Sequence, residues 1–195
     1  MEIQNNDIEK VKAVFENANK NYIIMDLNEV DEDGNNSLLE AVGCENNEIL
    51  ELLIDYANEH NIILELNITN KNGLYPLLSA TSKNHIKSVK LLMEYANNNN
   101  INLNIKEKDS IGSYPLACAV SNNNIDLIKL LFEYSDKQNI ILEYKEPKYI
   151  NISDEIFRLF QEYSKKEKVK IEYKNNSEFL VKYKEFDELR IKVNI

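Results

Sequence analysis

The sequence predicts an all-α solenoid in which pairs of helices stack along the chain and are joined by short extended arms. Three observations predict this class. Six columns of identical residues recur at a spacing of 39. Apolar residues within each unit follow helical spacing. The 195 residues include only 4 glycines and 3 prolines, too few for an all-β fold rich in tight turns.

The repeat itself is the strongest signal in the chain. Six independent columns in one register over three units are very hard to obtain by chance, and a period of this length is typical of stacked repeats. The columns are Gly34, Gly73 and Gly112; Leu38, Leu77 and Leu116; Ala41, Ala80 and Ala119; Leu53, Leu92 and Leu131; Tyr56, Tyr95 and Tyr134; and Leu64, Leu103 and Leu142.

Each unit is expected to contain a short helix, a longer helix and an arm. Pro76 and Pro115 open the short helix, because a first turn tolerates the missing N–H of proline. The longer helix carries a broad apolar face, as in residues 89–96. Alternating apolar residues in 62–67, 101–105 and 140–144 predict strand-like arms. The repeated glycine marks a loop tip that needs a positive φ.

The same alignment predicts how the chain is divided. Residues 1–28 form an N-terminal half repeat, whose helix Asp7 caps, and residues 29–145 form three full repeats. Residues 146–174 form a shortened fourth repeat that lacks its first helix. Residues 175–195 form a C-terminal cap or tail, with an amphipathic helix expected over 177–189.

The pattern resembles the ankyrin repeat over roughly residues 8–174. The T-P-L-H-x-A signature of that family corresponds to residues 75–80 and 114–119, with a weaker copy at 36–41, and residues 84–93 echo its G-H-x-E-I-V-K-L-L-L stretch. The Thr and His of the signature are lost, and Tyr75 and Tyr114 are expected to replace that polar brace by packing. About six residues inserted near 58–61 predict a longer outer helix or an extra turn on the convex side.

No catalytic pattern emerges from the residue types. Glycine spacing excludes a dinucleotide fingerprint and a P-loop, and two cysteines exclude a disulfide framework or a Cys-rich zinc site. His85 is expected to be structural and His60 solvated, while Cys118 is expected to be packed and Cys44 partly exposed. The repeated tyrosines are expected to be core rather than a binding stripe. No cofactor or metal is therefore expected.

Net charge further restricts the partners. Residues 1–144 carry 11 basic and 23 acidic side chains, which disfavours nucleic acid. No signal peptide or membrane span is predicted, and the two cysteines fit a reducing compartment. We therefore expect a cytoplasmic monomer, with a nuclear location left open.

The resemblance implies a non-enzymatic scaffold whose concave face, built from loop tips and first helices, binds a partner protein. Leu74 and Ile111 are of special interest, because a loop tip has no core for an apolar side chain to fill. The alternative to a contact residue is an ordinary exposed apolar residue, which is common on protein surfaces. The residues implied are Glu32, Asp33, Asn35, Lys71, Asn72, Leu74, Ser82, Lys83, Ser110, Ile111, Ser113, Ser121 and Asn122.

Two other functions stay open at this point. One is a substrate-recruiting adaptor of a larger complex, such as a ubiquitin ligase, although no docking motif is recognisable in residues 175–195. The other is an enzyme with a site in the C-terminal segment. That second alternative requires at least two of five side chains to meet in a pocket, namely Arg158, Glu162, Tyr163, Glu172 and Arg190.

Overall fold

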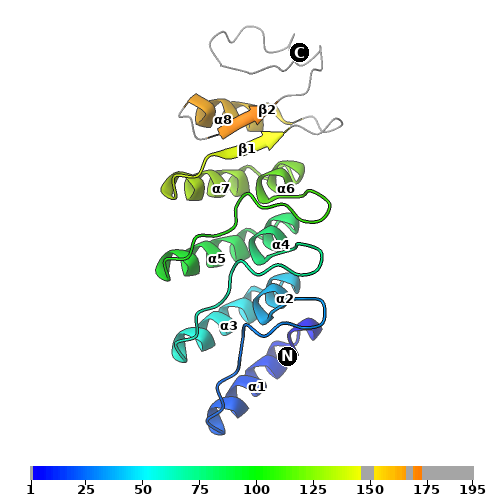
Figure 1. Cartoon of the computed structure of the whole chain (residues 1–195), viewed down its shortest axis with the longest axis vertical. Coiled ribbons are helices and arrows are strands. Elements are labelled where there is room, and N and C mark those ends of the chain that lie inside the picture. The colour runs from blue at the N-terminus through cyan, green and yellow to red at the C-terminus, as the bar shows by residue number, and fades with distance from the viewer. Residues whose placement is uncertain (1, 146–151, 166–168, 173–195) are drawn as a thin grey trace. The chain divides into compact units, whose positions relative to one another are not determined.

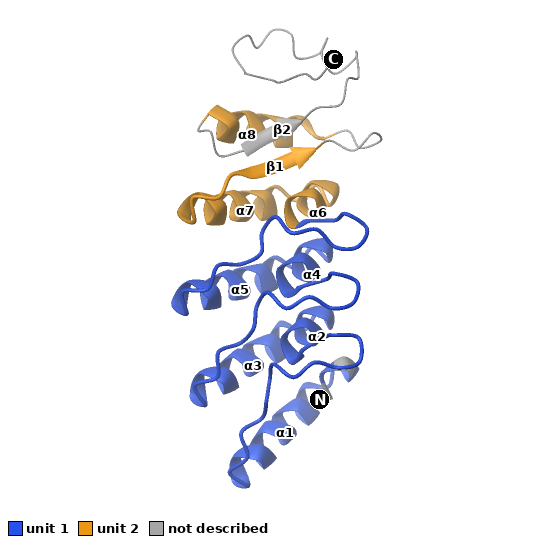
Figure 2. Cartoon of the chain, in the orientation of Figure 1, with its two compact units in different colours: residues 1–114 blue, residues 115–195 orange. Residues whose placement is uncertain are grey.

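The computed structural model describes residues 2–145, 152–165 and 169–172. The chain forms two compact units, unit 1 at residues 1–114 and unit 2 at residues 115–195, and each is described by itself (Figure 2). The cap expected at 175–195, with its helix over 177–189, lies outside the described residues. The repeat boundaries drawn above stay a prediction.

Unit 1 consists of paired helices in register with the repeat. The outer helices α1, α3 and α5 lie side by side, and the shorter helices α2 and α4 pack against α3 and α5 (Figure 1). One 3-10 turn precedes α1 and contacts both α1 and α2. The elements are η1 (Glu2–Asn5), α1 (Ile8–Lys20), α2 (Ser37–Gly43), α3 (Asn47–Glu59), α4 (Pro76–Ser82) and α5 (Ile86–Asn98).

Most α-helices in unit 1 start at a local sequence signal. Asp7 caps α1 as predicted, and its carboxylate accepts a hydrogen bond from the Lys10 N–H at 3.2 Å. Asn36 and Asn46 cap α2 and α3 in the same way. Pro76 begins α4 in the first-turn position that the sequence predicts. These local signals place the starts of α1, α2, α3 and α4 without help from distant residues, whereas α5 begins after His85 without a side-chain cap.

The turns of unit 1 depend on a left-handed backbone at regular intervals. The loop-tip glycines Gly34 and Gly73 have φ of 85° and 74°, as the sequence predicts. A Cβ on Gly73 would lie 3.0 Å from the Cα of Asp109, so glycine is needed for space as well as for conformation. Outer helices α3 and α5 are each followed by an asparagine with φ of 56°, namely Asn61 and Asn100.

The predicted core residues are buried. Leu53 and Leu92 are fully enclosed, and Tyr56 and Tyr95 are at most 4% exposed. Leu91, which the apolar face of the helix includes, is only half-buried because it lies at the edge of that face. The tyrosine columns are therefore core, as predicted. The inserted residues extend the outer helix to 13 residues in α3, also as predicted.

In unit 1 each of two arms is tied by hydrogen bonds to a tyrosine on the following outer helix, and no β-ladder joins the arms. The hydroxyl of Tyr95 donates to the Ile62 carbonyl at 3.1 Å and accepts from the Leu64 N–H at 3.1 Å. Tyr56 bridges Ile23 and Met25 in the preceding arm in the same manner. The arms at 62–67 and 101–105, which were expected to be strand-like, contain no strand.

Two predictions about single residues of unit 1 need correction. Tyr75 is fully buried, but packing is not its whole role, since its hydroxyl donates to the Glu107 carbonyl at 2.8 Å and keeps a polar brace. His60 is half-buried rather than fully solvated: its ring packs against Tyr56, tilted by 40° with the centroids 4.2 Å apart, and its Nε2 lies 2.8 Å from Asn19 Oδ1. The contacts of Tyr75 with Glu107 and of His60 with Asn19 each join residues more than 30 positions apart, which the sequence did not reveal.

Unit 2 contains three helices and a two-stranded parallel sheet among its described residues. The sheet pairs Leu142 with Val169 and Tyr144 with Ile171. The third predicted arm thus becomes a strand, and a helix stands where the shortened fourth repeat predicts its second helix. The elements are α6 (Pro115–Ser121), α7 (Ile125–Lys137), β1 (Leu142–Lys145), α8 (Asp154–Lys165) and β2 (Val169–Glu172). The predicted all-α class is confirmed.

The glycine column can be tested with a matched pair of alanine substitutions. Gly73→Ala is expected to lower the free energy of unfolding by at least about 1 kcal/mol, because it forces alanine into a left-handed conformation against a backbone. Gly43→Ala, in α2 with nothing within 4 Å, is expected to raise it by up to about 1 kcal/mol. Urea unfolding followed by circular dichroism measures both, and equal effects would contradict the assignment.

The tyrosine bridge can be tested by removing one oxygen atom. Tyr95→Phe is expected to cost about 1–3 kcal/mol of unfolding free energy, because it leaves the Ile62 carbonyl and the Leu64 N–H without their partner. Tyr22→Phe is the matched control, since Tyr22 is 96% exposed and is expected to change stability by less than about 0.5 kcal/mol. A Tyr95→Phe variant as stable as this control would show that the bridge is dispensable.

Candidate functional site

Three loop tips of unit 1 share one hydrogen-bonding design. Each begins with Asp or Asn, at positions 31, 70 and 109, and the side-chain oxygen accepts two backbone N–H groups, two and four residues further on. In the third tip, Asp109 accepts from Ile111 at 3.1 Å and from Ser113 at 2.7 Å. This Asx turn fixes the tip backbone from within.

Neighbouring tips are also tied to each other. The Lys71 N–H donates to the Asp33 carbonyl at 2.9 Å, and the Ser110 N–H donates to the Asn72 carbonyl at 3.0 Å. The tips therefore lie in a row, and the side chains at equivalent positions 33, 72 and 111 follow one another along it. The first-position residues Asp31, Asn70 and Asp109 were missed at the sequence level, although their spacing of 39 would have revealed them.

The predicted tip residues differ in exposure. Ile111 is 85% exposed, whereas Leu74 is half-buried. Asn35 is engaged in the loop, since its amide accepts from Asn70 and donates to Asp31. Five others are exposed: Glu32, Asp33, Lys71, Asn72 and Ser110; Ser113 is half-buried. The structure thus brings all nine tip residues into one row. Ile111 is the one large apolar side chain among them that is exposed.

The predicted residues at the ends of the first helices are exposed as well. Ser82 and Lys83 end α4 in unit 1, and the Lys83 ammonium donates to the Gly43 carbonyl at the end of α2. Ser121 and Asn122 are exposed at the end of α6, in unit 2, and are described with that unit. Lys83 therefore makes a contact within unit 1 in addition to its predicted place on the concave binding face.

Charge is unevenly distributed along the row. The first tip carries Asp31, Glu32 and Asp33 without a basic residue, whereas the segment leading to the third tip contains Lys106 and Lys108. The Asn35 N–H, together with the Asn35 amide and the Asp33 N–H, lowers the pKa of Asp31 below its usual 3.8. The first tip is consequently anionic at neutral pH.

The histidines and cysteines serve local structure. His85 is largely buried, and its Nε2 lies 3.4 Å from a carboxylate oxygen of Glu45. Neither cysteine forms a disulfide, and both are half-buried. The Cys44 thiol donates to the Ile3 carbonyl at 3.0 Å, and burial raises its pKa, which disfavours a reactive thiolate. Among the described residues no group of three or more metal-ligating side chains occurs.

Three of the five C-terminal candidates lie on α8 in the described part of unit 2. Tyr163 packs its ring 4.4 Å from that of Phe132, while Arg158 and Glu162 are exposed on α8. The Glu172 side chain and Arg190 lie outside the described residues. None of the described helices has the length and hydropathy that a bilayer crossing requires.

The pKa of Asp31 gives a direct test of the loop-tip hydrogen bonds. In a carboxyl carbon NMR titration, Asp31 is expected to titrate below 3.8 in the folded chain. Because the folded pKa is lowered, its contribution to stability is present above the unfolded pKa and is lost as pH falls through the folded value. The urea-unfolded chain is the control, and a folded midpoint at or above 3.8 would contradict the Asx-turn geometry.

Comparisons with known proteins agree with this geometry. Residues 60–142 match the family model described as ankyrin repeats (3 copies). The match covers the second predicted repeat and most of the third, includes the loop tips at 70–75 and 109–114, and ends at the first residue of β1. The comparison with curated proteins gave no match.

Proposed function

Because the chain belongs to the ankyrin-repeat family, we propose that it binds a partner protein through the loop tips and first helices of unit 1. Ankyrin repeats are generally protein–protein interaction modules and are typically non-enzymatic. We call the tip residues 32–35, 71–74 and 110–113, together with Ser82 and Lys83, the recognition face. It corresponds to the concave face of an ankyrin-type stack.

The observation that carries the proposal is the exposure of Ile111. Its side chain is 85% exposed, while equivalent positions in the other tips hold polar Asp33 and Asn72. Burying an isoleucine stabilises a complex by roughly 1.5–3 kcal/mol, so a partner that covers it gains a substantial part of its affinity at one point. A scattered exposed apolar residue is common, but this one stands on a backbone fixed by hydrogen bonds, in the third tip of a defined row.

Rigidity supports the same proposal. The Asx turns and the bonds between tips hold the face in place before any partner arrives. Binding then loses little backbone entropy, so modest contacts give useful affinity. Loop residues carried on a rigid scaffold are a common arrangement for binding.

Charge defines the partner more closely. The first tip is anionic and the third tip is flanked by lysines, so the fitting partner presents basic groups toward Glu32 and Asp33 and an apolar group toward Ile111. The proposal includes a monomeric, non-enzymatic scaffold in the cytoplasm, in line with two cysteines that form no disulfide. Ser121 and Asn122 belong to the proposal as candidate contacts of unit 2.

A pair of isoleucine substitutions tests the recognition face. Immobilised full-length chain is used to capture proteins from a lysate of its source cells, with quantitative mass spectrometry as the readout. Ile111→Asp is expected to reduce recovery of specific partners about tenfold, because it replaces an apolar anchor by a charge.

The matched control is Ile63→Asp, since Ile63 is 57% exposed on an arm and lies outside the recognition face. Circular dichroism confirms that both variants are folded. Equal recovery by the wild type and Ile111→Asp, or equal losses for both variants, would remove Ile111 from the site.

A further inference from the structure

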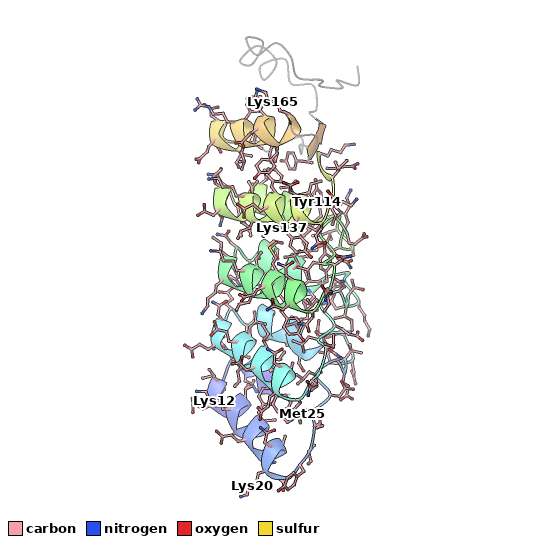
Figure 3. All side chains as sticks on the ribbon, turned by 90° about the vertical axis from the view of Figure 1, so that its left-hand side faces the viewer. Lys12, Lys20, Met25, Tyr114, Lys137 and Lys165 are labelled. Carbon is pink, nitrogen blue, oxygen red and sulfur yellow. The ribbon has the colours of Figure 1, made fainter. Side chains whose placement is uncertain are left out.

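A groove lies at the N-terminal edge of unit 1. Its volume is about 340 Å³, and it is bounded by η1, by the arm that follows α1 and by the start of α2. Met25, on that arm, is labelled in Figure 3. The lining residues are Ile3, Met25, Asp26, Glu29, Val30, Asp31, Asn35, Asn36, Ser37 and Glu40.

The repeat alignment shows how this edge differs from the next repeat. A shift of 39 residues aligns η1 with 41–44, so it takes the place of the last turn of a first helix. One repeat further on, the counterparts of Met25 and Glu40 are Leu64 and Ser79, and both are only 1% exposed. Met25 and Glu40 themselves are half-buried.

The arm beside the groove also has an unfilled hydrogen-bonding edge. One repeat later, the Ile63 carbonyl accepts from the side-chain amide of Asn28 at 2.8 Å, and the Glu65 N–H donates to the same amide at 2.9 Å. Asn67 makes the same pair of bonds to the next arm, at 2.7 and 2.8 Å. The equivalent groups on the first arm are the Ile24 carbonyl and the Asp26 N–H, and no described residue supplies an amide to them.

Exposed apolar side chains continue this edge. Tyr22 is 96% exposed, Ile23 54% and Ile24 64%. Tyr22 has φ of 57° at the position that asparagine occupies after the other outer helices of unit 1. An aromatic residue is unfavourable in this conformation, so local structure does not account for its presence. Three consecutive exposed apolar residues beside an unpaired backbone edge are typical of a surface that pairs with another chain.

The groove carries a strong negative charge. Four carboxylates line it, at Asp26, Glu29, Asp31 and Glu40, and the lining contains no basic residue. Asp31 stays ionised because its loop N–H groups hold its pKa below the usual value. The apolar part of the lining, at Ile3, Met25 and Val30, suits the aliphatic stem of a long cationic side chain.

We propose that this edge docks an extended peptide segment of a partner protein in which Lys or Arg accompanies apolar residues. The peptide backbone or a side-chain amide pairs with the Ile24 carbonyl and the Asp26 N–H, as strand addition does at a sheet edge. Apolar residues cover Tyr22 and Ile24, and the cation enters the groove toward Glu29. The inference rests on the proposed function, because the groove shares Asp31 and Asn35 with the first loop tip.

A selection from random peptides tests the docking site with the full-length chain. Phage-displayed decapeptides are enriched on the immobilised chain, and enriched sequences are measured as fluorescein-labelled peptides by fluorescence anisotropy. We expect sequences that combine Lys or Arg with apolar residues. Glu29→Lys is expected to weaken their binding about tenfold or more, because it reverses a charge at the groove and removes no described contact.

Controls separate charge, location and the proposed function. Glu94→Lys makes the same change in net charge on the exposed surface of α5, outside the groove, and is expected to leave peptide affinity within about twofold of the wild type. Ile111→Asp is likewise expected to leave peptide affinity unchanged. Loss of partner capture in Ile111→Asp alone and loss of peptide binding in Glu29→Lys alone therefore report on different sites.

Several results would overturn the docking site. These are the absence of any enriched peptide, enrichment of acidic peptides, or equal peptide affinity for the wild type and Glu29→Lys. Sedimentation velocity can also give a result that overturns it, namely a concentration-dependent dimer that Tyr22→Ser abolishes. Such a dimer would assign the edge to a second copy of the chain instead.

Discussion

The buried hydroxyl of the repeated tyrosine is the interaction on which the arrangement of unit 1 depends. Tyr95 supplies both a donor and an acceptor to one arm of the preceding repeat, and Tyr56 does the same one repeat earlier. Apolar packing alone does not fix the register between repeats, because apolar contact is non-directional and a small shift costs little free energy. A buried pair of hydrogen bonds, by contrast, is satisfied in only one geometry. The loop tips inherit their spacing from this register.

How much the sequence predicts depends on whether the cause is local. Helix starts at Asp7 and Pro76 and the left-handed glycines follow from short-range rules, and the structure has them where they were expected. The hydrogen-bonded loop tips were predicted only in part. The glycine was recognised, but the Asp or Asn three residues before it was not, because that column conserves an oxygen acceptor rather than one residue type. A search by chemistry would have found it.

Contacts between distant residues account for most of the rest. The strand-like arms of unit 1 form no ladder because Asn28 and Asn67 insert their amides between neighbouring arms and satisfy the edge groups. The bond from Tyr75 to Glu107 and the contact of His60 with Asn19 depend on how repeats stack. Sequence spacing predicts that these residues approach each other, but not which polar atoms meet.

Positions where a repeat column changes residue type are informative, but only together with the contacts of the new side chain. Glu45 replaces the asparagine found at Asn84, yet its carboxylate meets His85 at 3.4 Å, so that change is absorbed by the fold. Ile111 and Tyr22 also break their columns, but each is at least 85% exposed. A solvent-exposed apolar side chain contributes little to folding, and at Tyr22 the backbone conformation is unfavourable as well. Folding therefore does not account for these two residues, and this is why we propose that each contacts another molecule.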